Sequence, residues 1–532
     1  MRKRKYRYGY RHIIVLLGFL GNFVLYITRL TFNAMVFRMT PKTLFFPNIS
    51  DPGECPLKKG ATWIDGGPNM ETYTWTGVER THLMVSFYYG YLLSQIPSGY
   101  LAEQYGAKRL FALGVGVCGF LAFLMPLAAR YGYTALLCTR LSMGICQGFS
   151  IPVLSTIFGR WIPPLERTQL LAFAAAGVPV GIALVFPISA GFAELYGWSS
   201  AFYFAGTVSL MFLMAWSVFV FDSPEEHPFI TGMEKSYIIS SIGAPAMGVK
   251  PSTVPWKSMA TSGPFWALVL CSWCADWGSF MLINTIPLYL QGYFKLNLLT
   301  TADYMAIPYA VTSIIVASLS SVANYLISKE KCTRTVLRKI STAIGTFVPG
   351  ILLIALSFQV CSFTTAITLF TLITGFSGFC NFGFRVNFND ISPSHAGLLW
   401  GIATTIGTIS GAIVPWVTRA YIGHPGAQTQ GNWQKVFLIG AAHYIAGGIC
   451  YSLLGSGEQQ VWDHKEKGFE ARRTSPESLW EKLRKDGHWR FPMPKEKKSI
   501  PPWIPPSGEA ELTTGTLERQ EARRRSSIVP PM

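Results

Sequence analysis

Twelve apolar segments, each long enough to cross a bilayer as a helix, dominate this chain of 532 residues. A membrane-spanning helix needs about 20 predominantly apolar residues, and a bilayer admits only helices or closed barrels because backbone groups must be paired there. The sequence therefore predicts an all-α membrane protein. The segments lie approximately at residues 12–37, 81–101, 109–129, 132–155, 168–192, 200–221, 263–291, 302–327, 339–359, 363–386, 396–420 and 434–455.

The composition agrees with a chain that lies mostly in lipid. Charged residues make up 14% of it, against about 25% in soluble domains. The formal net charge is +17, but the basic residues flank apolar segments instead of forming one stripe with aromatics, which argues against nucleic acid as a partner. The ten cysteines are scattered and indicate no disulfide framework. We find no nucleotide loop, metal-ligand cluster or nucleophile elbow, so we expect a protein that is not an enzyme and uses no cofactor or metal.

Two signals predict the same topology. Basic residues at positions 2–11, together with the even number of segments, place both termini in the cytosol by the positive-inside rule. The loop at residues 38–80 would then be luminal or extracellular, and it holds the only N-x-S/T sequon, at Asn48, where we expect glycosylation. The membrane itself is left open: plasma membrane, or a lysosomal or vesicular membrane.

The composition also divides the chain along its length. We expect a basic cytosolic N-terminus (1–11), a six-helix bundle (12–221), a cytosolic central loop (222–262), a second six-helix bundle (263–456) and a disordered cytosolic tail (457–532). The two bundles echo each other in sequence, since a proline-containing loop precedes a glycine-rich helix in both. Parallel repeats of this kind place a binding site near the midplane, between the two halves.

Two charged residues lie deep inside apolar segments. A charge at the bilayer centre costs at least about 2.5 kcal/mol, so it faces a protein interior or a water-filled cavity. Arg29 either binds an anion or is neutralised by an internal carboxylate. Asp276 is a proton or cation site, a counter-ion to Arg29, or part of a structural ion pair. For Arg385, which ends the tenth segment, a role in topology or gating is favoured over substrate contact.

The loop after the second segment reads GYLAEQYGAKR and resembles the loop signature of the major facilitator superfamily. Its glycines permit close approach and a tight turn, its acid suits the N-terminus of a neighbouring helix, and its basic residues suit the cytosolic face. The resemblance implies a conformational loop motif made of Gly99, Glu103, Gly106, Lys108 and Arg109.

Six blocks in the same order resemble solute carrier family 17, the anion–cation symporters. These blocks are Ser86–Arg109, Trp161–Leu171, Gly197–Gly206, Asp222–Ile238, Asn389–Ile402 and the GNWQKVF before the last segment. The resemblance covers roughly residues 12–462. It implies two pseudo-symmetric six-helix bundles, and secondary active transport of an organic or inorganic anion by alternating access, with sodium or a proton as co-substrate.

The resemblance also assigns substrate contact to Arg29 and to Arg140 in the fourth segment. From the residues alone, Arg140 could instead snorkel to the interface. Gln147 can donate to a substrate oxygen or form an interhelical hydrogen bond. Tyr88, on the second segment, either contacts substrate or packs against a neighbouring helix.

The chain departs from the sialin and glutamate-transporter branches of that family. Two carboxylates that follow the fourth-segment arginine there are Met143 and Gln147 here, and neither side chain titrates. A proton would need another carrier, and Asp276 is the obvious candidate. Two alternatives stay open, namely an electrogenic, voltage-driven anion uniporter and a non-transporting membrane receptor or scaffold. The identity of the anion, the coupling ion and the oligomeric state also stay open.

Overall fold

The computed structural model describes residues 9–40, 71–242, 254–329, 331–393, 395–424 and 427–463. Asn48 and the tail beyond residue 463 lie outside these ranges. The first half comprises α1 (Tyr10–Met39), α2 (Gly77–Tyr105), α3 (Ala107–Tyr131), α4 (Tyr133–Gly148), α5 (Ser150–Trp161), α6 (Arg167–Ala175), α7 (Gly177–Tyr196) and α8 (Trp198–Phe219). The second comprises α11 (Gly263–Gly292), α12 (Leu298–Ser328), α13 (Arg334–Ser357), α14 (Phe363–Ser377), η3 (Gly378–Asn381), α15 (Phe384–Ile391), α16 (Ala396–Ile422) and α17 (Gln430–Leu454).

These helices make twelve long segments. Eleven are long and apolar enough to cross a membrane, and three of the eleven are composite: α4 with α5, α6 with α7, and α14 with η3 and α15. The twelfth is α2, which has 29 residues and several tyrosine and polar side chains. It packs between α4 and α16. The break between α4 and α5, at Phe149, is one that the apolar pattern does not indicate.

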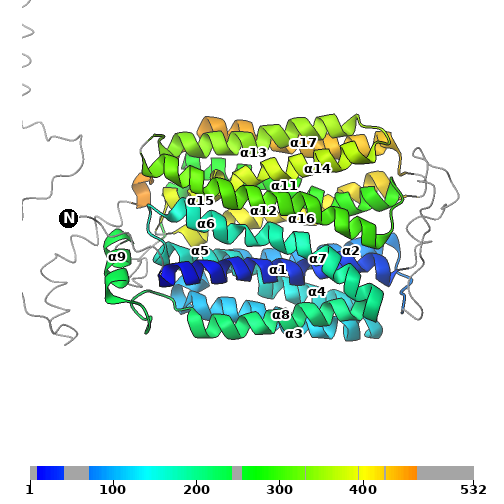
Figure 1. Ribbon diagram of the computed structural model, residues 1–532, viewed down its shortest axis with the longest axis horizontal. Coiled ribbons are helices and arrows are strands. Elements are labelled where there is room, and N and C mark those ends of the chain that lie inside the picture. The colour runs from blue at the N-terminus through cyan, green and yellow to red at the C-terminus, as the bar shows by residue number, and fades with distance from the viewer. Residues whose placement is uncertain are drawn as a thin grey trace, which may run out of the picture. The chain divides into compact units, whose positions relative to one another are not determined.

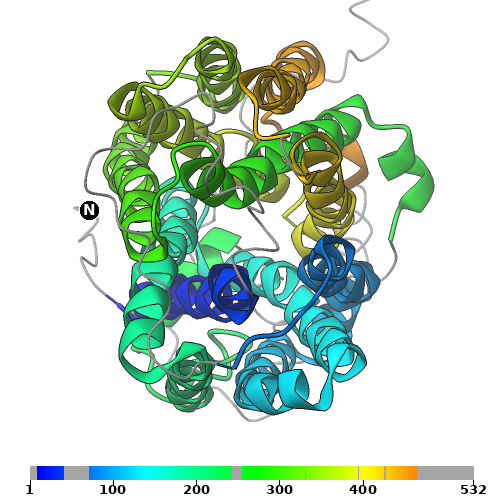
Figure 2. The same cartoon turned by 90° about the vertical axis from the view of Figure 1, so that its right-hand side faces the viewer.

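The two halves form two helical bundles (Figures 1 and 2). In the first, α1 packs on α7 and α8, and α3 packs on α8. In the second, α17 packs on α11 and α13, and α12 packs on α14. The bundles meet where α2 and α5 pack on α16, and where α6 and α7 pack on α12. Figure 2 looks along the helices and shows the first bundle, blue to teal, beside the second, green to orange.

Local sequence signals begin and end several of these helices. Thr76 caps α2 by accepting a hydrogen bond from the Glu79 backbone N–H (3.2 Å), and the Glu79 carboxylate accepts one from the Thr76 backbone N–H (2.7 Å). The Asn297 side chain caps α12 by accepting a hydrogen bond from the Thr300 backbone N–H (2.8 Å). Gly106, between α2 and α3, has a φ of 98°, a left-handed conformation that favours glycine. The tight turn predicted there therefore has a backbone that needs Gly106.

The polar linker between the bundles contains two helices, α9 (Gly232–Ile242) and α10 (Trp256–Ala260). Helix α9 is held against the start of α1, because Glu234 accepts the Tyr10 N–H (2.9 Å) and pairs with the Arg11 Nη1 (3.1 Å). Arg11 also pairs with Glu166, through Nε at 2.8 Å. We call the side of the molecule that carries α9 and Tyr10 the α9 face.

His227, in the same linker, is 5% exposed and lies among aromatic rings. The Tyr10, Phe221 and Trp161 ring centroids are 4.4, 4.7 and 5.5 Å away. Burial lowers the pKa of His227 below its ordinary value of about 6.5. The folded protein therefore binds fewer protons here than the unfolded chain does. This contribution to stability is fully present above about pH 6.5 and declines as the pH falls.

We expect His227→Gln to reduce the loss of thermal stability on acidification. The measurement is the unfolding midpoint of purified protein in detergent, compared between about pH 7.5 and pH 5.5. The carboxylates of the protein contribute equally to wild type and variant. The difference between the two pH-induced changes in the unfolding midpoint therefore isolates the contribution of His227. Equal shifts in wild type and variant would contradict the assignment.

One sequence expectation about cysteine is wrong. Cys361, between α13 and α14, is disulfide-bonded. The scattered spacing of the cysteines gave no sign of it, because disulfide pairing depends on the distance between two residues in the fold. Eight other cysteines, among them Cys271 and Cys274, are free thiols.

Candidate functional site

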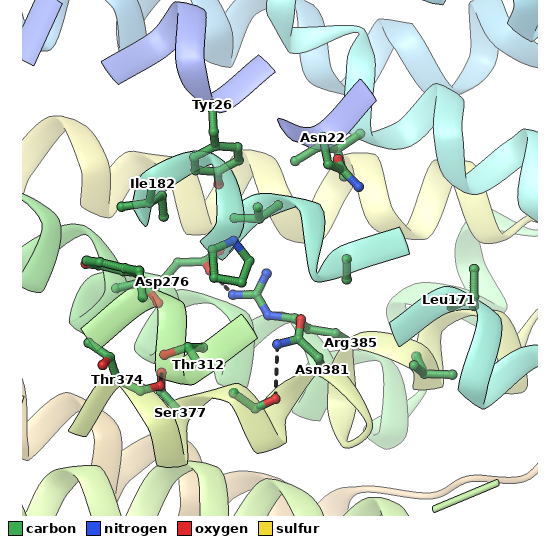
Figure 3. Close-up of a pocket in the computed structure, with 18 of the residues that line it drawn as sticks. Asn22, Tyr26, Leu171, Ile182, Asp276, Thr312, Thr374, Ser377, Asn381 and Arg385 are labelled. Atoms are coloured by element: carbon green, nitrogen blue, oxygen red, sulfur yellow. Dashed lines mark hydrogen bonds and ion pairs between the residues drawn. The ribbon is translucent and has the colours of Figure 1, made fainter. Parts of the chain in front are cut away.

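A cavity of about 210 Å³ lies between the two bundles (Figure 3). Its wall is formed by α1, α5, α6 and α7 from the first bundle and by α11, α12, α14, α15 and α16 from the second. Most of the wall is apolar. The polar side chains that line it are Asn22, Tyr26, Ser155, Asp276, Ser279, Tyr309, Thr312, Thr374, Ser377, Asn381, Arg385 and Asn389.

Asp276 and Arg385 are the charged residues in this wall, and they pair with each other. Arg385 Nη2 lies 2.9 Å from Asp276 Oδ1, joining α15 to α11 (Figure 3). The interpretation of Asp276 as a counter-ion to Arg29 is therefore wrong, because its carboxylate is paired with Arg385. Arg385 does not stand at the end of the membrane segment, where a topology or gating role was favoured. It lines the cavity instead, because the chain continues as α15.

Arg29 lies on α1 beside the cavity and is 4% exposed. Its Nε donates to Gln147 Oε1 at 2.9 Å. Its guanidinium carbon lies 4.5 to 5.0 Å from three ring centroids, those of Tyr91, Tyr26 and Phe87. No carboxylate pairs with Arg29 among the described residues. Its charge is held by aromatic faces and an amide oxygen, which differs from the internal carboxylate weighed from the sequence.

Gln147 holds Arg29 in place. The Gln147 side chain is buried on α4, and its Nε2 donates to Leu25 O (2.9 Å) and to Thr28 Oγ1 (3.0 Å) on α1. Both donors are thereby used, and its oxygen accepts from Arg29. Gln147 thus makes the interhelical hydrogen bonds that were one of its two interpretations, and in this conformation it positions Arg29.

Arg140, on α4, contacts the same Phe87 ring. It is 1% exposed, and its Nε donates to Leu83 O at 3.3 Å. Its guanidinium carbon lies 4.4 Å from the Phe32 ring centroid and 5.2 Å from that of Phe87. Nη1 has no hydrogen-bond partner within the described part of the chain. The alternative in which Arg140 snorkels to the interface is wrong, because the side chain is enclosed between α1 and α2.

Tyr88 is 2% exposed and packs edge-on against Phe280 of α11, with ring centroids 5.2 Å apart. Phe280 lines the cavity, so Tyr88 supports the wall from behind. Phe87, one residue earlier, is the ring shared by both arginines, and sequence reasoning missed it. Phe87 and Tyr91 are four residues apart and share one helix face, a spacing that was readable in the sequence.

Close approach of α2 and α4 brings the Phe87 ring beside Arg140. A Cβ at Gly144 would meet the Phe87 carbonyl oxygen, and one at Gly90 would meet that of Leu141. These neighbours are backbone atoms, which cannot move aside like a flexible side chain. Glycine at both positions therefore allows the contact.

We expect Gly144→Val to lower the stability of the folded protein by about 3 kcal/mol or more, at the upper end of the overpacking range. The measurement is the thermal midpoint and the monodisperse fraction in size-exclusion chromatography. Gly191→Val is the matched control, because the Cβ it adds on α7 meets no atom within 4 Å. If the two variants lost stability equally, the α2–α4 contact would not be the cause.

The motif predicted as a loop at residues 99–109 is described in part, and it forms the end of α2, the turn at Gly106 and the start of α3. The Lys108 backbone N–H donates to Asp222 Oδ1 at 2.8 Å, and Trp216 Nε1 donates to Lys108 O at 3.1 Å. The turn is thus tied to the end of the first bundle. Arg109 is exposed. Gly99 lies within α2, and the side chain of Glu103 is outside the described part.

Contacts between the bundles lie beside the cavity toward the α9 face. Arg338 of α13 pairs with Asp390 of α15 at 2.9 Å and donates to Thr168 Oγ1 of α6 at 2.9 Å. Arg167 of α6 donates to Asn389 O at 2.8 Å. The cavity-lining segments of the two bundles are therefore joined here.

Comparison with known proteins identifies the family. Residues 18–415 match the model of the Major Facilitator Superfamily. Sialin of Ovis aries is 32% identical over 458 residues, which cover 86% of this chain and 92% of that protein. The chain belongs to solute carrier family 17 of the Major Facilitator Superfamily. This transporter is also 31% identical to a putative inorganic phosphate cotransporter of Drosophila melanogaster, over 86% of this chain and 87% of that one.

A second relative and a solved structure agree. Vesicular glutamate transporter 1 of Xenopus tropicalis is 32% identical over 74% of this chain and 68% of that protein. The structure of a proton:xylose symporter superposes with a TM-score of 0.61 at 14% identity, covering 85% of this chain and 97% of that one. The predicted fold class is confirmed: an all-α membrane protein with the two-bundle major facilitator architecture. The chain is a multi-pass membrane transporter, as predicted, and belongs to a family of transporters and not of enzymes.

Proposed function

We propose that this transporter moves an organic or inorganic anion by alternating access and couples its movement to a cation, sodium or a proton. One observation carries the proposal. Arg29 and Arg140 place two buried guanidinium groups around one phenylalanine ring, and no carboxylate pairs with either within the described residues.

The energetics of the pair favour an anion. A buried charge without a partner costs several kcal/mol, and two like charges in a medium of low dielectric repel each other. A carboxylate or phosphate group would offset both costs through charge-assisted, bidentate hydrogen bonds. The relatives carry compatible names, since glutamate and inorganic phosphate are both anions.

The proposed pathway runs between the two bundles. We infer that Arg29 and Arg140 bind the anion, with Gln147 holding Arg29 and Tyr88 supporting the wall. Asp276 lines the adjacent cavity and is its one carboxylate among the described residues, which makes it the coupling candidate. The bundles at residues 12–221 and 263–456 would rock about this region, and the motif around Gly106 would take part in that movement.

We further propose that the α9 face is cytosolic and that both termini lie there. This face carries a cluster of basic residues at helix ends: Lys108, Arg109, Arg160, Arg334 and Lys339. Positive charge of this kind favours the cytosolic side. The sequon at Asn48 would then lie on the luminal or extracellular side and accept a glycan.

The test is uptake into liposomes that contain purified protein, with sodium, proton and voltage gradients imposed one at a time. The probes are labelled inorganic phosphate, glutamate and an acidic sugar. We expect saturable accumulation driven by a cation gradient at zero potential. Accumulation that follows voltage alone would favour an electrogenic uniporter. Binding without counterflow would favour a non-transporting receptor or scaffold.

A further inference from the structure

We propose that Arg385 is a third anion-binding residue of this transporter, beside Arg29 and Arg140, and that Asp276 is its exchangeable counter-ion, protonated when the transported anion takes its place. This inference rests on the proposed function, because it names a further residue of the same pathway. It also commits to the proton as the coupled cation.

The exposure of the pair is the first argument. Among the described residues, two arginine–aspartate pairs join helices of the second bundle. The Arg338–Asp390 pair is sealed, with side chains 1% and 4% exposed. The Arg385–Asp276 pair opens onto the cavity, with side chains 31% and 17% exposed (Figure 3). A pair whose task was only structural would have no need to face the space between the bundles.

The contacts of Arg385 are the second argument. A guanidinium offers five N–H donors, and Arg385 makes one hydrogen bond, from Nη2 to Asp276, within the described residues. By contrast, Arg338 donates to Asp390, Thr168 and Phe382 O. Arg385 therefore keeps donors for a carboxylate or phosphate, which can accept two parallel hydrogen bonds where Asp276 accepts one.

The surroundings of Asp276 are the third argument. Its Oδ1 accepts from Arg385, and its Oδ2 lies against Gly407 of α16, which adds no polar side chain. Among the described residues, the other titratable side chains that the neighbouring helices bring near the pair are tyrosines and cysteines, whose ordinary pKa values lie at about 8.5 or above. They are Tyr26 of α1, Tyr309 of α12, Cys380 of η3, Tyr444 of α17 and Cys271 of α11 itself. Asp276 is thus the carboxyl group there that can take up a proton.

The exchange conserves charge at every step. An anion entering the cavity replaces the Asp276 carboxylate at the Arg385 guanidinium, and Asp276 takes up a proton from the solution on the side from which the anion entered. Arg385 is never left without a counter-charge, the state that is expensive in a buried site. When the anion leaves, Asp276 loses the proton and returns to Arg385. One monovalent anion and one proton thereby cross together, with no net movement of charge.

Tyr26 links two of the proposed anion contacts, Arg29 and Arg385. Tyr26 lines the cavity, and its ring centroid lies 4.8 Å from the guanidinium carbon of Arg29. Arg29 belongs to the first bundle and Arg385 to the second. An anion that contacts both residues would hold the bundles together, which gives the bound substrate a means of favouring one conformation over another.

Three variants of the full chain in liposomes test the exchange, with inorganic phosphate and glutamate as probes. For Asp276→Asn, we expect proton-driven accumulation to disappear while anion counterflow continues, with a KM several-fold lower because Arg385 is free. For Arg385→Gln, we expect the counterflow KM to rise about tenfold or more through loss of a charge-assisted contact. For the double variant, we expect wild-type abundance and thermal stability with the KM still raised.

The double variant separates anion binding from structure. If Asp276→Asn combined with Arg385→Gln restored the wild-type KM, the pair would be structural and the inference would be overturned. If proton-driven accumulation survived in Asp276→Asn, the role of Asp276 would be overturned. The same would follow if the wild type accumulated the anion on a sodium gradient and Asp276→Asn abolished that accumulation.

Anion-dependent thermal stabilisation in detergent gives a second readout. If Arg29→Gln lost this thermal stabilisation while Arg385→Gln kept it, the inference about Arg385 would fail and the proposed function would stand. If the wild-type protein neither transported phosphate or glutamate nor was stabilised by them, the inference and the proposed function would both be overturned.

Discussion

Replacing Arg29 with alanine is expected to abolish saturable anion uptake, lowering kcat/KM about a hundredfold or more. The guanidinium is buried among the rings of Tyr26, Phe87 and Tyr91, where water cannot substitute for its charge. Hydrogen bonds to a charged group contribute about 1.5–3 kcal/mol each, and a bidentate contact would lose two. The measurement is initial uptake of inorganic phosphate and glutamate into liposomes, normalised to the amount of protein reconstituted.

Two controls accompany this prediction. Arg38→Ala removes an arginine from the last turn of the same helix, where it pairs with Glu194, and we expect uptake close to wild type. Arg29→Lys keeps the charge but loses the planar fork, so we expect partial activity. Wild-type uptake by Arg29→Ala at normal abundance would remove Arg29 from the substrate site.

Asp390→Asn is expected to destabilise the folded transporter by about 3–5 kcal/mol, the cost of leaving a buried charge without its partner. Arg338 is 1% exposed and would lose its carboxylate while remaining enclosed between α6, α13 and α15. The contacts of this arginine also join the two bundles through Thr168. We therefore expect both a lower thermal midpoint and a weaker connection between the bundles on the α9 face.

The control for Asp390→Asn is a neutral pair, Arg338→Met with Asp390→Leu. Replacement of both charges by apolar groups of similar volume is often neutral or stabilising, so we expect most of the thermal stability to return. Thr168→Val removes one inter-bundle hydrogen bond and is expected to cost about 1 kcal/mol. An unchanged midpoint in Asp390→Asn would show that Arg338 finds another counter-charge.

The spanning segments could be predicted from the chain itself, because each is recorded locally as a run of apolar residues. The segment at residues 12–37 became α1 (Tyr10–Met39), and its polar ends extend past the apolar core. The ends of α2 and α3 could also be read, since Gly106 and Gly132 supply the positive φ that joins one helix to the next. The break at Phe149 could not, because the apolar pattern continues through it.

The candidate site was predictable only in part. Arg29 was identified because a charged residue inside a run of apolar residues can be recognised from the sequence alone. The pairing of Asp276 was not, because its partner lies 109 residues away on a helix that the apolar pattern placed near the membrane surface. Gln147 was identified as a polar residue of α4, yet its hydrogen bonds to Leu25 and Thr28 follow from the packing of α4 on α1.

The sequence by itself determined that this chain is a helical membrane protein of twelve segments with a buried arginine in the first, because hydrophobicity and the cost of a buried charge act on each segment separately. Only the tertiary structure decided which charges are paired. It sealed Arg338 with Asp390 and opened Arg385 with Asp276 onto a cavity. It also placed Arg29 and Arg140 at one phenylalanine ring, with no carboxylate pairing with either in the described part of the chain. These outcomes depend on distances between helices that are remote in the chain, and electrostatic energy depends on distance and burial, not on order in the sequence.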